Sequence, residues 1–464
     1  MSVSKRPAQK EVSRRTFLAH SGTLAAAGAA VVQFSPLRSA HAASSDELKV
    51  ALIGCGGRGT GAAVQALSTA GPVKLWAMAD AFADRLQISL NAIQKGQAQR
   101  NDKEEHSGFK AKVDVPPERQ FIGLDAYRHA IDSGVDVVVF AEPPGFRPEH
   151  FEYAVRAGKH MFIEKPLASD APGVRRLLAA NEEAKRKGLK IGVGLQRHHD
   201  PAYQEIVQQL QDGAIGDILY FRCYWNTANP AKTPPAREGL TEMQYQVRNW
   251  YFFAWLSGDH ICEQHIHNLD VCNWVKNAHP VEAQGQGGRQ VRTSKDYGHI
   301  FDHHSVEFTY ADGTQMFSNC RQIPGCWNSV SEHAHGTKGY ADIGTGAIEP
   351  AGYKPQPAGE GKSRRRRKTQ GPNPYQIEHD VLFDAIRNDK PHNEVEHAAH
   401  STMTAILGRM ATYSGKVVTW DEAMESGLAL VPQVADWDSV PPVLPDEQGF
   451  YPVAMPGTTE VLEG

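Results

Sequence analysis

Lys49-Val50-Ala51-Leu52-Ile53-Gly54-Cys55-Gly56-Gly57-Arg58-Gly59 is the stretch that decides the fold of the N-terminal half. The apolar run up to Ile53 predicts a short buried strand, and residues 60–64 can begin a helix. Between them stands G-x-G-x-x-G, in which the first glycine allows a tight turn, the second lets the backbone approach a pyrophosphate and the third lets helix and strand pack closely. The free N–H groups of the following helix also favour phosphate. This stretch therefore predicts a dinucleotide site.

An acidic residue follows where such a site needs one. A second apolar strand, residues 73–79, ends at Asp80, 21 residues after Gly59. A carboxylate at this position accepts hydrogen bonds from the adenosine ribose hydroxyls and repels a 2′-phosphate. The sequence therefore predicts NAD rather than NADP.

Strands and helices continue to alternate up to residue 196. Apolar strands are expected at 135–140, 160–163 and 191–195, with helices at 126–133 and 148–158. This order predicts a doubly wound parallel sheet, whose ligands bind beyond the carboxyl ends of the strands. The residues expected to bind the cofactor lie at those ends: Gly54, Gly56, Gly57, Arg58, Gly59, Asp80, Glu142, Pro143, Glu164, Lys165 and Gln196.

The overall composition excludes several classes of protein. The chain has 464 residues, of which 41% are hydrophobic and 22% charged, with a net charge of −4. These values are typical of globular proteins and exclude a largely disordered chain or a polytopic membrane protein. The balanced charge gives no electrostatic footprint for nucleic acid.

The N-terminus has the features of an export signal. Arg14-Arg15 precedes an Ala/Gly-rich apolar run, and Ala40-His41-Ala42 has the form of a cleavage site. We interpret residues 1–42 as a twin-arginine signal peptide, which predicts export in the folded state to the periplasm. The apolar run is too short and too polar for a membrane anchor, and no later stretch of the sequence approaches a span.

The second half is predicted to be rich in antiparallel strands. Residues 217–225, 304–310 and 315–320 read as strands, the last two joined by a hairpin turn at 311–314. We therefore expect an NAD-binding Rossmann domain at 47–196, a substrate and oligomerisation domain at 197–440 and a Pro-rich C-terminal tail at 441–464.

Between these strands, residues 258–270 combine acidic and histidine side chains on an expected helix. Cys262, Ile266, Leu269 and Cys272 share an apolar helical face. Glu263 and His267 stand one turn apart beside that face and can converge on one ligand. As metal ligands, Glu263, His265 and His267 form an alternative set with zinc as the first candidate. Alternate residues diverge on a helix, however, so we expect no metal.

These motifs resemble those of the Gfo/Idh/MocA oxidoreductases. The resemblance rests on the glycine loop, on Ala157-Gly158-Lys159-His160 and on Glu164-Lys165-Pro166. It implies a Rossmann domain followed by an α/β domain with a large open, mostly antiparallel sheet, and activity on sugars, inositols or related polyols. It also implies that Glu263 takes the acidic position, His267 the catalytic histidine position and Asp270 the trailing aspartate position. The family's usual aspartate is a glutamate here, so the role of Glu263 is less firmly implied than that of His267.

The chemistry of these residue types fits alcohol oxidation. Histidine, with a pKa near neutrality, can take the hydroxyl proton, and Lys165 can stabilise the alkoxide that forms. We therefore expect Lys165, His267 and Glu263 to be catalytic in an NAD-dependent oxidoreductase that acts on a small carbohydrate and forms a homo-oligomer. An NAD-dependent glycosidase, which oxidises one carbon transiently to permit elimination, is the alternative. A non-catalytic sugar-binding protein is less consistent with a base and a hydride acceptor in one chain.

Overall fold

The computed structural model describes residues 46–97, 109–352, 373–432 and 436–462. The expected signal peptide at 1–42 lies outside the described residues. None of the helices in the described ranges is long and apolar enough to cross a membrane.

The N-terminal half folds around a parallel sheet of six strands in the order β3-β2-β1-β4-β5-β6, which confirms the predicted doubly wound fold. Its strands are β1 (Leu48–Ile53), β2 (Val73–Asp80), β3 (Gln120–Ile122), β4 (Val137–Phe140), β5 (His160–Ile163) and β6 (Ile191–Val193). Its helices are α2 (Gly57–Leu67), α3 (Ala83–Gln94), α4 (Phe109–Lys112), α5 (Ala126–Asp132), α6 (Arg147–Arg156) and α7 (Ala171–Arg186). All four residues of β4 are buried, as expected for a central strand.

The second half is built on an eight-stranded sheet in the order β13-β12-β11-β7-β10-β9-β8-β14. The strands are β7 (Ile218–Thr227), β8 (Pro280–Gly288), β9 (His303–Tyr310), β10 (Gln315–Gln322), β11 (Ser329–Gly336), β12 (Gly339–Asp342), β13 (Ala347–Pro350) and β14 (Val418–Thr419). Every neighbouring pair is antiparallel except β7 and β10, which confirms the predicted mostly antiparallel sheet.

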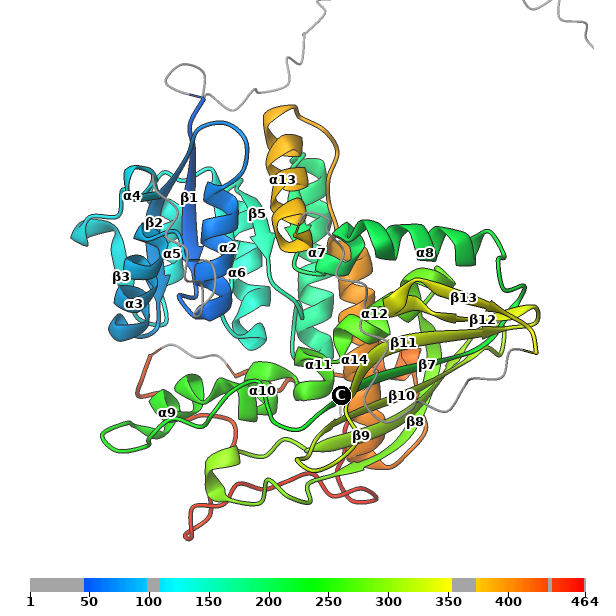
Figure 1. Cartoon of the computed structure of the whole chain (residues 1–464). Helices are drawn as coiled ribbons and strands as arrows, with labels where there is room; N and C mark the ends of the chain where they lie inside the picture. The colour runs from blue at the N-terminus through cyan, green and yellow to red at the C-terminus, as the bar shows by residue number, and fades with distance from the viewer. Residues whose placement is uncertain (1–45, 98–108, 353–372, 433–435, 463–464) are drawn as a thin grey trace, which may run out of the picture. The chain divides into compact units, whose positions relative to one another are not determined.

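Some helices of the second half pack on this sheet, and others lie against the first domain (Figure 1). They are α8 (Pro201–Gln211), α9 (Glu242–Arg248), α10 (Ala254–Ser257), α11 (His260–Glu263), α12 (Ile266–Lys276), α13 (Pro374–Arg387), α14 (Val395–Ser414) and α15 (Trp420–Glu425). Helix α14 packs on β8 and β9, and α12 packs on β7. Helix α13 packs instead on α2 and β6, so a late part of the chain stabilises the parallel sheet.

The expectation of one continuous helix in the segment 258–270 is wrong, because the helix is broken into α11 and α12. The break falls at Gln264 and His265, between the two predicted site residues Glu263 and His267. The His265 imidazole is fully buried, bonded through Nε2 to Ser318 Oγ of β10 (2.8 Å) and through Nδ1 to Asn268 Oδ1 (3.2 Å). Satisfying this buried imidazole draws the backbone out of regular helix geometry. The apolar face is nevertheless as expected, since Cys262 and Ile266 are both fully buried.

Candidate active site

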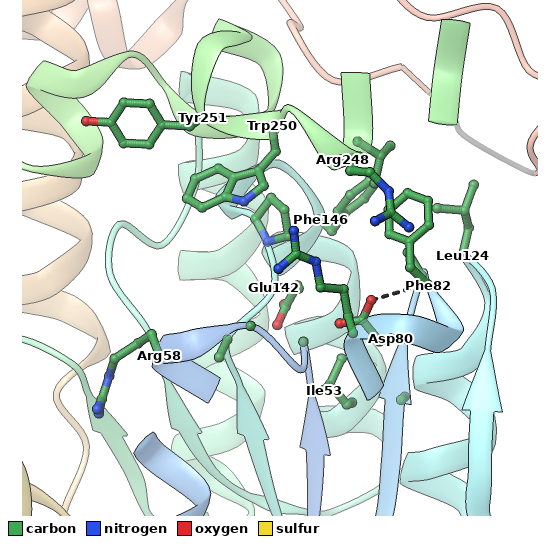
Figure 2. A pocket seen from close by; sticks show the side chains of 18 of the residues that line it. Ile53, Arg58, Asp80, Phe82, Leu124, Glu142, Phe146, Arg248, Trp250 and Tyr251 are labelled. Carbon is green, nitrogen blue, oxygen red and sulfur yellow. Dashed lines mark hydrogen bonds between the residues drawn. The ribbon is translucent and has the colours of Figure 1, made fainter. Parts of the chain in front are cut away.

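A cavity of about 450 Å³ lies at the carboxyl ends of β1, β2 and β4 (Figure 2). Its floor contains the glycine loop, Asp80, Glu142 and Pro143, which were predicted to bind the cofactor. Its opposite wall comes from residues 231–251, which follow β7. A volume of this size is typical of a small-molecule site.

The glycine loop has the shape that a diphosphate needs. A Cβ atom on Gly59 would lie 2.0 Å from the Gly54 carbonyl oxygen, so only glycine allows helix α2 to approach the strand this closely. Gly54 adopts a φ of +89°, which glycine alone adopts readily. By contrast, a Cβ on Gly56 or Gly57 would meet nothing within 4 Å, and both residues line the cavity. The first turn of α2 thus leaves an open cradle at its N-terminus that fits a dinucleotide.

Asp80 lies at the end of β2 on the cavity floor. Its Oδ1 accepts from Phe82 N (2.8 Å) and its Oδ2 from Cys55 N (2.6 Å), so the carboxylate links the glycine loop to the start of α3. Burial raises the pKa of Asp80, while these two backbone donors act in the opposite direction. Each oxygen retains a second lone pair, which permits the predicted acceptance from ribose hydroxyls.

Arg58 and Glu164, both predicted to bind the cofactor, bind each other. The Arg58 guanidinium pairs with Glu164 and with Glu378 of α13 (3.2 Å), and it also donates to Gln65 Oε1 (2.9 Å). In Figure 2 its side chain points away from Asp80 and Glu142. These ion pairs position the first turn of α2 and tie α13 to it.

Glu142 presents a buried carboxylate to the cavity. Only 6% of the residue is exposed, and neither carboxylate oxygen has a hydrogen-bond partner among the described residues. The nearest basic group is His150 Nδ1, 3.3 Å from Oε1. An unpartnered buried acceptor facing a cavity fits a site that receives ligand hydroxyls. Gln196 also has a buried acceptor, Oε1, without a hydrogen-bond partner among the described residues, while its Nε2 donates to Tyr375 OH (3.0 Å).

The structure brings Lys165 and Glu263 together. Lys165 Nζ donates to the Glu263 backbone carbonyl and lies 3.2 Å from its Oε1. Only 11% of the lysine side chain and 12% of the glutamate side chain are exposed. Glu263 therefore holds the ammonium group of Lys165, which follows β5, at the end of α11.

His267 is buried and has a free ring nitrogen. Its Nδ1 has no hydrogen-bond partner among the described residues, and its ring stacks on Trp225 of β7 (centroids 5.9 Å). Burial holds the pKa of His267 well below its usual value, and the charges of Lys165, Arg197 and Arg58 lower it further. The imidazole is therefore neutral at physiological pH and able to accept a proton.

Sequence reasoning missed Arg197, which directly follows Gln196. Arg197 donates to the His267 backbone carbonyl (2.9 Å) and pairs with the fully buried Glu332 of β11. It therefore fixes the start of α12. Asp270 has a related positioning role, since it bonds His198 Nε2 (2.9 Å) and Ser401 Oγ of α14 (2.8 Å).

The structure does not gather the alternative metal ligands Glu263, His265 and His267. Glu263 bonds Lys165, and both nitrogens of His265 have the protein partners described above. A different buried group combines Asp259, His260 and His304. Asp259 accepts from His260 Nδ1 (2.8 Å), Phe301 N (3.0 Å) and Tyr413 OH (2.7 Å), distances typical of hydrogen bonds. We interpret Asp259 as a structural hub, that is, a buried acceptor before α11 that joins α14 and the segment before β9 by hydrogen bonds and contacts β9 through His304.

Replacing Asp259 by alanine should lower the free energy of unfolding by about 3–5 kcal/mol, because it removes one partner from a fully buried polar network. Chemical denaturation monitored by circular dichroism measures this. The control is Glu152→Ala, which removes the partner of Arg156 and Arg176 at the surface and should cost about 1 kcal/mol or less. Equal effects of the two substitutions would contradict the role of Asp259 as a hub.

The wall of the cavity formed by residues 231–251 is the largest feature that sequence reasoning missed. Residues 250–255 are rich in aromatic side chains. Phe252, Phe253 and Trp255 are buried, whereas Trp250 lines the cavity. Lys232 and Arg248, which precede these residues in the chain, also line the cavity.

Comparisons with known proteins agree with this arrangement. A family model described as an oxidoreductase family NAD-binding Rossmann fold matches residues 48–195, and a GFO/IDH/MocA C-terminal domain model matches residues 203–342. An inositol 2-dehydrogenase of Klebsiella pneumoniae (strain 342) is 27% identical over 219 residues, which cover 46% of this chain and 57% of the relative. The matched region thus spans little more than half of that curated relative.

Solved structures with the same fold cover more of the chain. Aldose-aldose oxidoreductase from Caulobacter crescentus, complexed with glycerol, superimposes with a TM-score of 0.58 at 18% identity, over 80% of this chain and 99% of that one. The scyllo-inositol dehydrogenase from Lactobacillus casei with bound NAD(H) and scyllo-inositol gives 0.57 at 18% identity, over 81% and 99%. At these identities the similarity shows the fold.

Proposed function

The chain belongs to the Gfo/Idh/MocA family of oxidoreductases, and we propose that it interconverts a hydroxyl group and a ketone on a sugar, glycoside or cyclitol. The observation that carries this proposal is the buried His267, whose pKa is held low by burial and by the charges of Lys165, Arg197 and Arg58, so that its imidazole is neutral. A base of this kind beside an NAD-binding domain suits alcohol oxidation.

The residues of the cavity floor fit NAD. The backbone at Gly56 and Gly57 would hold the diphosphate and Asp80 the ribose hydroxyls, and the carboxylate of Glu142 would be available to further hydroxyls of the ligand. When bound, NAD supplies an acceptor or donor of hydride for the substrate carbon.

Two side chains of this chain act on the substrate oxygen, and a third positions one of them. His267 takes the hydroxyl proton on its imidazole in the oxidative direction and returns it in the reductive one. Lys165 donates a hydrogen bond to the same oxygen and stabilises the negative charge that develops on it. Glu263 holds the Lys165 ammonium in place.

A screen of free sugars, cyclitols and glycosides with the purified protein tests this function, with product masses recorded. Oxidation lowers the substrate mass by two hydrogens. A glycosidase that oxidises transiently releases an aglycone and a sugar with no net redox change, so the same screen separates the alternative. Binding of a sugar with no product of either kind would contradict both and support a non-catalytic sugar-binding protein.

We also propose export by the twin-arginine route, which rests on the order of arginine pair, apolar run and cleavage site in residues 13–42. Replacing Arg14 and Arg15 by lysine should leave the precursor in the cytoplasm, whereas the native chain should reach the periplasm shortened after Ala42. Cell fractionation and N-terminal sequencing measure this. Equal export of both chains would contradict the assignment. The homo-oligomer stays a prediction, which sedimentation of the mature chain would check.

A further inference from the structure

Residues 228–257, which we name the roof segment, form an apolar cluster of their own next to the cavity. Helices α9 and α10 lie within it, and Tyr245, Phe253 and Trp255 are buried to 1% exposure or less. The cluster includes Phe82 and Phe146 from the first domain. It also includes residues of the C-terminal part of the chain: Leu430, Val431, Trp437, Val443 and Tyr451. Three distant parts of the sequence therefore meet over the dinucleotide site.

The roof segment faces the cavity with polar and aromatic side chains. Figure 2 shows Trp250 and Arg248 extending from it toward the strand ends that carry Ile53 and Asp80. A molecule held on the glycine loop therefore has the first domain on one side and the roof segment on the other. Contacts with the roof segment would therefore slow its departure.

Arg248 ties the roof segment to the first domain beside Asp80. Its guanidinium donates to both carboxylate oxygens of Asp84 (2.9 and 2.8 Å) and lies 4.1 Å from the centroid of the Phe82 ring. Phe82 and Asp84 flank the start of α3, directly after Asp80. This bidentate pair spans from the roof to the residues next to the expected ribose site, and its geometry makes it stronger than a single-contact ion pair.

The C-terminal part of the chain closes on the same point. The Trp437 ring packs on the Phe82 ring with centroids 5.3 Å apart. Residues before it are anchored by the Leu430 and Val431 N–H groups, which donate to Asp170 Oδ2 (2.7 and 3.2 Å). Tyr451 OH donates to Glu242 Oε1 of α9 (2.6 Å). This bond holds the C-terminal part of the chain against the roof segment.

Two cations face the enclosed space from opposite sides. Arg85 of α3 and Lys232 of the roof segment both line the cavity. Within the described ranges, neither forms an ion pair with an acidic side chain. A dinucleotide carries two negative charges on its diphosphate, so a closed roof would supply countercharge that an open one would withdraw.

We propose that the roof segment, fastened by Arg248 to Asp84 and by Trp437 to Phe82, is a clamp that retains NAD through many catalytic cycles. The proposal rests on the function proposed above. It assigns Arg248 and Trp437 a role in cofactor retention, with no part in proton transfer. A retained cofactor must be reoxidised in place, which favours a reaction that returns the hydride to the same substrate or passes it to a second carbonyl compound.

The rate at which NAD(H) leaves the purified protein tests the clamp. The native protein, dialysed against buffer without cofactor, should carry about one NAD(H) per chain by mass spectrometry of the denatured supernatant. Arg248→Ala and Trp437→Ala should each lose the cofactor about tenfold faster, a change equivalent to about 1.4 kcal/mol, since each removes one contact that fastens the roof segment. The double variant should lose it faster still. Arg176→Ala removes an exposed arginine–carboxylate pair on α7 and should leave the rate unchanged.

Exchange of the two charges separates retention from misfolding. Arg248→Asp combined with Asp84→Arg should restore slow release, whereas either change alone should not. If the native protein exchanges NAD as fast as the double alanine variant, or if the charge exchange does not slow release, the clamp is overturned while the proposed function stands. If the native protein binds no NAD at any concentration, the proposed function is overturned with it.

Discussion

His267→Ala should lower kcat by a factor of about 10²–10⁴ while NAD stays bound, because it removes the general base and no cavity-floor residue. Steady-state rates, with the NAD content measured on the same preparation, test this. Lys165→Ala should also lose most activity, since the alkoxide then forms without its hydrogen-bond donor.

A matched histidine substitution gives the control for this loss. His129→Ala changes an exposed histidine on α5 and should leave kcat at its native value. Near-normal turnover in His267→Ala would remove the proposed mechanism, even with the cofactor fully bound. Because burial lowers the pKa of His267, its neutral form should also persist below pH 6.5. Activity should therefore not decline in the pH range in which an exposed histidine would become protonated.

Gly56→Val should reduce NAD affinity at least a hundredfold without unfolding the protein. Gly56 has a φ of −76°, which any residue adopts, and a Cβ there meets no protein atom within 4 Å. The valine side chain would therefore occupy only the space that the diphosphate needs. Equilibrium dialysis with NAD and the melting temperature together measure the effect.

Gly288→Ala is the control substitution for this prediction. Gly288 lies on β8 in the second domain, and a Cβ there would make an ordinary contact 3.5 Å from His303 Cε1. NAD affinity should therefore not change. Native affinity in Gly56→Val would mean that the cradle at the start of α2 does not hold the cofactor.

The sequence was sufficient to predict the parallel sheet and its cofactor edge. The reason is local: Ile53, the glycine loop and Asp80 lie within one strand–helix–strand unit, so their spacing alone determines their geometry. Only three strands of the second sheet, at 217–225, 304–310 and 315–320, were predicted from the residues themselves, the last two because they enclose a short turn. Its large, mostly antiparallel form was implied by the family resemblance.

The break between α11 and α12 could not be predicted from periodicity. The residues around it keep helical spacing, and the cause is a long-range bond from His265 to Ser318 on another strand. The roof segment was missed for a similar reason. Its contacts join Phe82, Arg248 and Trp437, which are far apart in the sequence, and its helices are too short to show a periodic apolar face.

Reduction of the cofactor by substrate in the purified protein, with no NAD added, tests the central claim most directly. Native protein and His267→Ala, each carrying measured NAD, would be mixed with the sugars, cyclitols and glycosides of the screen while the near-ultraviolet absorbance of reduced nicotinamide is followed. The account predicts that at least one polyol reduces the cofactor of the native protein at up to about one equivalent per chain, and that His267→Ala shows no such signal on this timescale. If borohydride reduces the bound cofactor in both proteins but no compound of the screen does so in the native one, the account of a polyol oxidoreductase is contradicted.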